Sequence, residues 1–375
     1  MNVLGPAERE KVSPPSQGAA TQQLSTAPLT SSPPALDMNT EIKPHSLITS
    51  APQTSQLVPR PEEARQIIDL LRSGFLDSAS LISMDLNEQN VSDLMTRFQD
   101  KVKLSEEAVF DPDPRQNTLL EMLPHQIAYW RPAELSPRET QIWITQWEQW
   151  RTKEFAGLIL DLRYFKDAND LEGAVSVTGL FAAPQTPLFR LEGIESPQVL
   201  YKTEHQPLSS ARPFPLLVLV NHNTRGAGEA LAWSLRQFAG AILIGQATAG
   251  EGGLFTETRL KSGRFLRMAS ARIVTAPPVS VSLLGSPIQP DIQVAVQMDR
   301  ERNAFFLANR QNLPGLIAER PAARRAGESD LIGIELPPPP ATEGKAALRD
   351  LTLQRAVDVL RGIVLSQREA DIHQD

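Results

Sequence analysis

The sequence predicts an α/β fold, because one stretch of the chain alternates apolar strands with a helix. Residues 216–220 (LLVLV) form an apolar run too short for a helix, which indicates a strand buried on both faces. A glycine-containing turn leads into residues 229–238, whose apolar side chains recur at helical spacing, with Glu229 where the helix dipole favours an acid. A second apolar run, 241–245, ends in a loop of small residues at 246–253. In α/β proteins, this order of strand, turn, helix, strand and loop forms functional sites at the ends of the strands.

The rest of the chain adds further predicted elements to this centre. A helix over 137–150 carries three tryptophans at spacings of four and three, and we interpret them as a stripe that faces the core. The type of 171–181, helix or strand, stays open. Other predictions are helices over 61–72 and 92–102 (with Ser92 as N-cap), strands at 126–131, 189–191 and 199–201, and a hairpin of 254–260 with 264–269.

Composition excludes several classes of function. The 375-residue chain has a formal net charge of −7 and no long basic run, so we expect no nucleic-acid partner. It contains no cysteine, and its five histidines are scattered, so we expect no metal and no other cofactor. No apolar run approaches the roughly 20 residues of a membrane helix, so no membrane span is expected.

The chain divides into four predicted regions. Residues 1–56 are rich in Pro, Ser, Thr and Gln and are predicted to be a disordered leader. The sequence as given opens without a basic and apolar signal, so we expect no signal peptide. Residues 57–110 form a small helical element, and 111–300 the α/β core. Residues 301–375 hold a linker with a proline run and a last helix, which we expect to dock on its own core, with a partner subunit as the alternative.

Two motifs in the central stretch carry a resemblance to a known family. Residues 220–229 read VNHNTRGAGE, and residues 245–252 read GQATAGEG. They resemble the strand ending V-N with the turn S-A-S-A-S-E, and the later G-x-x-T-x-G-K-G, of the tail-specific or C-terminal processing proteases, peptidase family S41. Residues 157–163 (GLILDLR) and the segment 285–294 (GSPIQPDIQV) resemble two more motifs of that family, so the likeness runs from about residue 127 to 294. On this resemblance we place 157–163 as the central strand of the sheet. It implies a ClpP/crotonase-like α/β core.

The same resemblance implies that the catalytic positions have changed. In the family, the middle serine of the turn is the nucleophile and the lysine of the later motif is its general base. Gly226 and Glu251 occupy those positions here, and a dyad needs a hydroxyl and a neutral amine. The family's oxyanion loop continues N-x-G-G after its strand, whereas no glycine pair follows Arg163. We therefore predict no catalytic residue at the standard positions.

Other residues near these motifs are weaker candidates for chemistry. Thr224 and Thr248 are hydroxyls on the two loops and are alternative nucleophiles with Glu251 as base, but Thr224 lies two residues before the nucleophile position. His222 has no acidic or hydroxyl partner that the sequence places beside it.

A buried carboxylate needs a partner, which leads to a structural hypothesis for Glu251. Arg225 lies on the facing loop, and we expect an ion pair between the two that fills the site. We predict that Arg225, Gly226, Ala227 and Glu251, together with Arg163, form the binding residues.

The functional prediction follows from these changes. We expect an S41-like protein that has lost proteolytic activity and binds peptides or protein C-terminal tails as a scaffolding or regulatory module. The alternative is a serine-type peptidase that uses non-standard residues. An acyl-CoA enzyme on the related crotonase architecture is disfavoured, because the motifs match those of the proteases. The family is usually exported, but the compartment and the oligomeric state stay open.

Overall fold

The computed structural model describes residues 57–107, 117–150, 156–165, 169–193, 199–204, 207–208, 214–277, 279–308, 313–317 and 348–372. The predicted leader and the proline run Pro337–Pro340 lie outside these residues. The helices are α1 (Pro61–Gly74), α2 (Ser78–Ser83), α3 (Val91–Arg97), α4 (Pro137–Trp150), α5 (Leu171–Gly179), α6 (Ala227–Phe238), α7 (Met298–Leu307) and α8 (Leu351–Ile372), with short 3-10 turns η1 (Pro124–Gln126) and η2 (Leu313–Leu316). The strands are β1 (Val102–Ser105), β2 (Leu119–Leu123), β3 (Ile127–Arg131), β4 (Gly157–Asp161), β5 (Pro187–Gly193), β6 (Leu200–Lys202), β7 (Leu216–Val220), β8 (Ile242–Gly245), β9 (Gly253–Arg259), β10 (Phe265–Thr275) and β11 (Ile292–Gln293).

A six-stranded sheet confirms the predicted α/β class. Its strand order is β11-β8-β7-β4-β3-β2, and every neighbouring pair is parallel except β2 with β3. The strands β4 and β7 lie in the middle of this order, where helices cover both faces, and all five residues of each strand are buried. The prediction that 157–163 provides a central strand is therefore confirmed.

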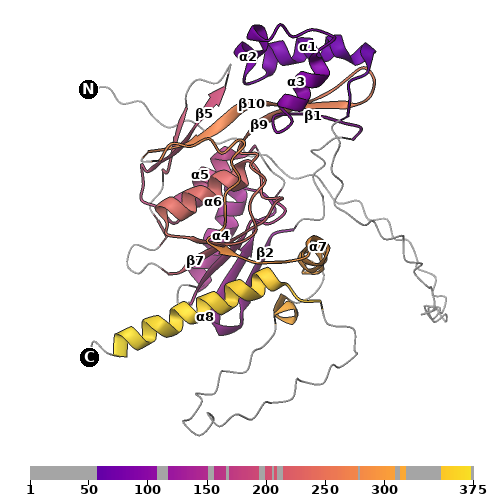
Figure 1. Cartoon of the computed structure of the whole chain (residues 1–375). Coiled ribbons are helices and arrows are strands. Elements are labelled where there is room, and N and C mark those ends of the chain that lie inside the picture. The colour runs from indigo at the N-terminus through magenta and orange to yellow at the C-terminus, as the bar shows by residue number, and fades with distance from the viewer. Residues whose placement is uncertain are drawn as a thin grey trace, which may run out of the picture. The chain divides into compact units, whose positions relative to one another are not determined.

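Helices pack on both faces of this sheet, which explains the apolar runs (Figure 1). On one face, α4, α5 and α6 pack against side chains such as Trp130, and the Trp143 ring stacks on it at 4.9 Å between centroids. The three tryptophans of α4 are buried, so the predicted core stripe is confirmed. On the other face, α8 packs Leu353 and Leu360 against the sheet residue Leu217, so the last helix docks on its own core.

A five-stranded sheet carries the N-terminal helices. The long strand β10 pairs antiparallel with β1, β5 and β9, and β5 pairs with β6. The predicted hairpin of 254–260 with 264–269 is therefore confirmed as β9 and β10. Helices α1 to α3 pack their apolar side chains on β1 and β10, in a cluster that contains Ile67, Leu71, Leu266 and Met268.

Part of the predicted helix over 92–102 is wrong. Helix α3 ends at Arg97 and its N-cap is Asn90 rather than Ser92. Val102 instead starts β1, where buried and half-buried residues alternate and Val102 pairs with Met268 of β10. The buried side chains of β1 recur at every second residue, as in a strand. The pairing of Val102 with β10 outweighs the helix that its spacing from the preceding apolar residues predicts. Most of the segment 171–181, whose type the sequence leaves open, forms helix α5. The Asp170 side chain caps this helix by accepting the Gly173 N–H at 2.8 Å.

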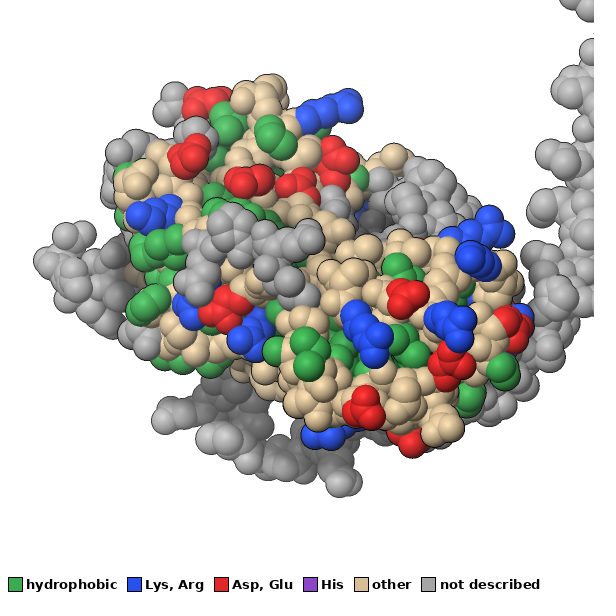
Figure 2. Space-filling view, turned by 90° about the horizontal axis from the view of Figure 1, so that it is seen from above, with side chains coloured by type: hydrophobic (Ala, Val, Ile, Leu, Met, Phe, Trp, Pro, Cys, Tyr) green, Lys and Arg blue, Asp and Glu red, His purple; other side chains and the backbone are tan. Residues whose placement is uncertain are grey.

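The arrangement of β4, β7 and β8 positions the candidate site. These strands are parallel neighbours, so the loops that leave their carboxyl ends meet at one edge of the sheet. Acidic and basic side chains are interspersed on the face that Figure 2 shows, with no large region of one sign. No helix within the described residues is long and apolar enough to cross a membrane.

Candidate functional site

The turn after β7 is held by its own polar side chains. Asn221 is fully buried, and its side-chain oxygen accepts the N–H groups of Asn223 at 3.0 Å and Tyr164 at 3.3 Å. The Thr224 hydroxyl donates to the Leu162 carbonyl at 2.9 Å and accepts the Asn221 N–H at 3.1 Å. These bonds join the loop after β4 to the turn after β7, so the sheet edge is fixed on two neighbouring strands.

Gly226 directly precedes helix α6 and adopts a backbone conformation that few other residues reach. Its φ is +49° and its ψ is −112°. This region is strained for residues with a Cβ atom, and such strained turns between a strand and a helix present nucleophiles in several hydrolases. The turn therefore keeps a sharp strand-to-helix geometry, but glycine supplies no reacting group.

Glu251 lies between two arginines. Arg225 Nη1 lies 3.2 Å from both carboxylate oxygens, and Arg267 Nη2 donates to Oε2 at 2.7 Å. The ion pair of Arg225 with Glu251 that the sequence predicted is confirmed. Arg267 is the second partner, and its guanidinium also stacks over the Phe255 ring at 3.6 Å. Both carboxylate oxygens of Glu251 are therefore occupied by guanidinium groups.

A second carboxylate, Glu229, lies buried behind this loop. Its Oε1 accepts the Thr248 hydroxyl at 2.5 Å and the Gly250 N–H at 2.8 Å. Burial raises the pKa of Glu229 to about 7, although these two hydrogen bonds lower it and the charge of Glu251 raises it further. Glu229 thus fastens the first turn of α6 to the loop that carries Glu251.

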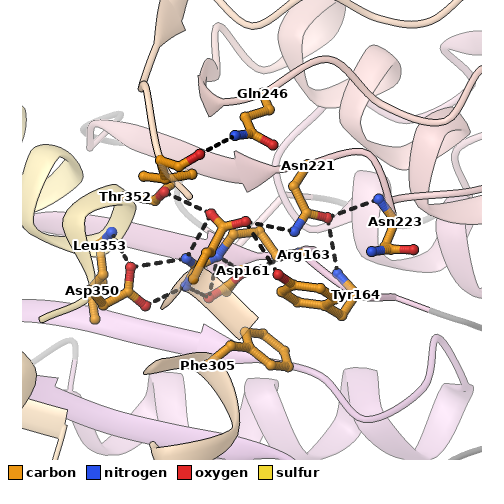
Figure 3. Close-up of polar contacts among 12 residues, drawn as sticks. Asp161, Arg163, Tyr164, Asn221, Asn223, Gln246, Phe305, Asp350, Thr352 and Leu353 are labelled. Atoms are coloured by element: carbon orange, nitrogen blue, oxygen red, sulfur yellow. Dashed lines mark hydrogen bonds and ion pairs between the residues drawn. The ribbon is translucent and has the colours of Figure 1, made fainter. Parts of the chain in front are cut away.

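A buried network centres on Arg163 (Figure 3). Its guanidinium bonds both oxygens of Asp161, with a shortest distance of 2.6 Å, and both oxygens of Asp350, at 2.9 and 2.8 Å. Its Nη1 also lies 3.3 Å from Glu301 Oε1. Burial alone lowers the pKa of Arg163, but the charges of Asp161 and Asp350 outweigh it and hold the pKa well above its usual range.

Glu301 connects this network to the turn after β7. Its Oε2 accepts the Asn221 side-chain N–H at 3.0 Å and the Tyr164 hydroxyl at 3.4 Å, and its Oε1 accepts the Thr352 hydroxyl at 2.8 Å. Tyr164 has a φ of +56°, which is unusual for a residue with a Cβ atom. Glu301 of α7 therefore contacts the turn that leads to Gly226, and Thr352 of α8 contacts Glu301.

The family comparison gives this geometry its context. The model of peptidase family S41 matches residues 126–294. This segment of the chain is similar to S41 peptidases. The chloroplastic C-terminal processing peptidase of Tetradesmus obliquus is 26% identical over 169 residues, which are 45% of this chain and 35% of that protein. The chloroplastic carboxyl-terminal-processing peptidase 3 of Arabidopsis thaliana is 34% identical over 84 residues, which are 22% of this chain and 16% of that protein.

Among solved structures, the photosystem II D1 C-terminal processing protease is 24% identical, with a TM-score of 0.38, over 52% of this chain and 48% of that chain. The matched segments thus span less than half of each of these three relatives. The mixed α/β architecture of the matched segment agrees with the predicted fold class.

The threonines of this S41-like core are not placed as free nucleophiles. Thr224 and Thr248 are 0% and 4% exposed. The Thr224 hydroxyl donates to a backbone carbonyl and that of Thr248 to Glu229, so neither bonds Glu251, the base that the sequence suggested for them. His222 contacts Asn223 through Nε2 at 2.8 Å, and its buried Nδ1 has no hydrogen-bond partner among the described residues.

The predicted binding residues fall into two groups. Arg225, Gly226 and Ala227 are consecutive, and Arg225 contacts Glu251 directly. Arg163 is 2% exposed and belongs to the buried network, and no described hydrogen bond joins it to Arg225 or Glu251. A binding role for these residues stays a prediction. In the described part of the chain, no group of three or more His, Asp or Glu side chains is arranged to hold a metal ion.

Sequence reasoning missed Arg267, the contact of Glu229 with Thr248, and the partners of Arg163. The sequence gives a weak indication of a role for Arg267, because it is the charged residue in the otherwise apolar strand segment 265–269. Glu229 was read only as a favourable charge at a helix start. Residues 166–168, which follow the altered oxyanion strand, lie outside the described residues.

Proposed function

We propose that this S41-like protein does not cleave peptide bonds and instead binds peptides or protein C-terminal tails as a scaffolding or regulatory module. The observation that carries the proposal is the state of the two dyad positions. Gly226 offers no hydroxyl, and Glu251 is held in ion pairs by Arg225 and Arg267. A dyad requires a nucleophile and a free base, and both are lacking at these positions. The curated relatives are C-terminal processing peptidases by name, which supports tails as the bound class.

A serine-type peptidase with non-standard residues is the competing proposal. Thr248 and Glu229 supply the arrangement that favours it, because a hydroxyl lies 2.5 Å from a carboxyl whose pKa is raised to about 7. The Thr248 hydroxyl also accepts the Ile288 N–H at 2.8 Å and is buried, so a substrate carbonyl has no approach to it without movement of the loop.

A mass-spectrometric time course tests the two proposals. The purified protein is incubated with unstructured proteins and with peptides that have apolar C-termini, beside a Thr224→Ala, Glu251→Ala variant and a Thr248→Ala variant. We expect no cleavage by any of them at long times. Cleavage by the natural protein that either variant lacks would establish an enzyme with a new nucleophile system and reject the non-catalytic proposal. Binding of the same peptides is followed in parallel by fluorescence anisotropy.

Restoring the dyad residues alone is expected to fail. The double variant Gly226→Ser, Glu251→Lys places a serine where φ is +49° and a lysine between Arg225 and Arg267. The serine is strained, and the lysine adds a third positive charge where the carboxylate bound the other two. The sequence after Arg163 also lacks the family's glycine pair.

We expect no peptide cleavage above that of the natural protein in the same mass-spectrometric assay. A triple variant that adds Arg225→Ala separates the charge effect from the others. Recovery of cleavage in the double variant would show that the oxyanion loop and the backbone remain competent.

A further inference from the structure

One carboxylate oxygen of α7 joins two of the loops at the carboxyl edge of the sheet. Glu301 Oε2 accepts the side-chain N–H of Asn221, in the turn after β7, at 3.0 Å, and the hydroxyl of Tyr164, in the loop after β4, at 3.4 Å (Figure 3). The Asn221 side-chain oxygen also accepts the Tyr164 N–H at 3.3 Å. The two loops are therefore fixed to each other and to α7 at one point.

This point is buried, which gives its hydrogen bonds their weight. The side chains of Glu301, Asn221 and Tyr164 are all buried. A buried donor that loses its partner bears its full desolvation penalty, because no water molecule replaces the acceptor. The carboxylate of Glu301 therefore favours the one arrangement of the two loops in which both donors reach it.

Ring contacts provide a second connection between α7 and the loop after β4. The centroid of the Tyr164 ring lies 4.8 Å from that of Phe305 and 6.0 Å from that of Phe306. The guanidinium of Arg131, the last residue of β3, lies over the Phe305 ring at 4.2 Å and donates to the Phe305 carbonyl at 2.9 Å. Helix α7 is thus joined to a strand of the sheet as well as to the loops.

Helix α8 contacts the other oxygen of the same carboxylate. Glu301 Oε1 accepts the Thr352 hydroxyl of α8 at 2.8 Å and lies 3.3 Å from Arg163 Nη1. Asp350, directly before α8, accepts hydrogen bonds from that guanidinium with both of its oxygens. One oxygen of Glu301 therefore contacts α8 and Arg163, and the other contacts the two loops. A displacement of α8 would reach the loops through this side chain.

We infer that Glu301 is a positioning residue of the candidate site: through it, α7 and α8 hold the turn at Asn221 and the loop at Tyr164 in the arrangement that binds a peptide. Both helices lie beyond the segment 126–294 that matches the family model, so the site is controlled from outside that segment. The effect on peptide affinity rests on the proposed function. The effect on the loops does not, and it is measured separately.

Amide hydrogen exchange of the full chain, followed by mass spectrometry, tests the effect on the loops. Residues 221–230 report on the turn, where Asn221 accepts the Asn223 N–H with its side chain and the Thr224 N–H with its carbonyl. Residues 254–269 of the other sheet report on global opening. We expect Glu301→Ala to speed exchange in the turn by about tenfold relative to the second segment. An equal change in both segments would show a merely structural role and reject the inference.

Three further variants identify the contacts responsible. Glu301→Gln keeps an oxygen for Asn221 and Tyr164, and its amide can donate to the Thr352 hydroxyl, so exchange in the turn should stay within about threefold of the natural rate. Asp299→Ala is the matched control, because Asp299 is an exposed acid in the same first turn of α7, and it should change neither segment. If Glu301→Ala does not fold, Thr352→Val removes only the bond from α8 and should speed exchange in the turn alone by about threefold.

Fluorescence anisotropy with the peptides that have apolar C-termini connects the loops to binding. We expect Glu301→Ala to weaken the affinity by about three- to tenfold and Glu301→Gln to restore most of it. Equal affinities of the natural protein and Glu301→Ala, with the turn loosened, would reject this inference while the proposed function stands. If no peptide binds the natural protein, the proposed function fails, and the exchange rates still decide whether Glu301 positions the loops.

Discussion

Replacing Arg163 with methionine is expected to remove about 3–5 kcal/mol from the free energy of unfolding. The arginine is the cation that three carboxylates share, those of Asp161, Glu301 and Asp350, and all four side chains are buried. Methionine fills a similar volume but leaves the three buried carboxylates without the cation that they share. The cost of a buried charge without its partner exceeds that of most single substitutions, so this variant should be among the least stable of the chain.

Urea denaturation measures the loss, and the chain supplies a matched control. Arg65 pairs with Glu88 at 3.0 Å on the surface, with side chains 82% and 53% exposed. Arg65→Met should cost at most about 1 kcal/mol, because water screens exposed pairs. If Arg163→Met does not fold, the double variant Arg163→Met, Asp350→Leu removes one of the carboxylates and should recover part of the loss. Equal effects of Arg163→Met and Arg65→Met would show that the network does not stabilise the fold.

Most of the core was predictable because its signals are local. The buried strand at 216–220 is apolar on both faces, which is the pattern of a central parallel strand, and 157–163 was placed by its likeness to a family motif. The pairing of Arg225 with Glu251 was also predictable, because the loops after neighbouring parallel strands meet at one edge. These inferences needed only short stretches of sequence and one rule of topology.

The Arg163 network could not be predicted from the sequence, because the partners of Arg163 are distant from it in the chain. Glu301 and Asp350 lie 138 and 187 residues beyond Arg163 in the chain, and nothing in their local sequence marks them as its partners. The prediction for Val102 was wrong for a similar reason, because its spacing in the sequence fits a helix while its pairing with Met268 in β10 makes it a strand residue. Long-range contacts decide both cases, and a pattern confined to neighbouring residues does not contain them.

The network also bears on how the site is held. Asp350 directly precedes α8, Thr352 lies in its first turn and Glu301 lies in α7. Both helices lie beyond the segment 126–294 that matches the model of family S41. Through Glu301 they reach Asn221, whose side chain fixes the turn leading to Gly226. The shape of the site therefore depends on groups outside the matched core, even though its own residues are in the core motifs.

The free energy of unfolding should depend on pH through Glu229. The gap in this free energy between the natural protein and Glu229→Gln should change by roughly 3 kcal/mol from pH 4.5 to pH 8. The pKa of Glu229 is raised from 4.5 to about 7 in the folded chain, so the folded state holds a proton that the unfolded chain releases more easily. The contribution of the protonated group to stability is complete below about pH 4.5 and is lost as pH rises through 7. Glutamine keeps a carbonyl oxygen for Thr248 and Gly250 and does not ionise.

The measurement compares urea unfolding of the two proteins at pH 4.5, 6, 7 and 8. We expect the difference in the free energy of unfolding between the two proteins to be nearly constant at the lowest pH. Towards pH 8, Glu229→Gln should become increasingly more stable than the natural protein. Glu172→Gln is the control, because Glu172 also lies in the first turn of a helix, α5, but is exposed. Its difference from the natural protein should stay flat. A flat difference for Glu229→Gln as well would mean that the carboxyl is ionised at neutral pH, so that the loop carrying Glu251 is held by a charged rather than a neutral group. That distinction matters for the site, because Glu229 is joined to Thr248 and Gly250, whose loop places Glu251 against Arg225.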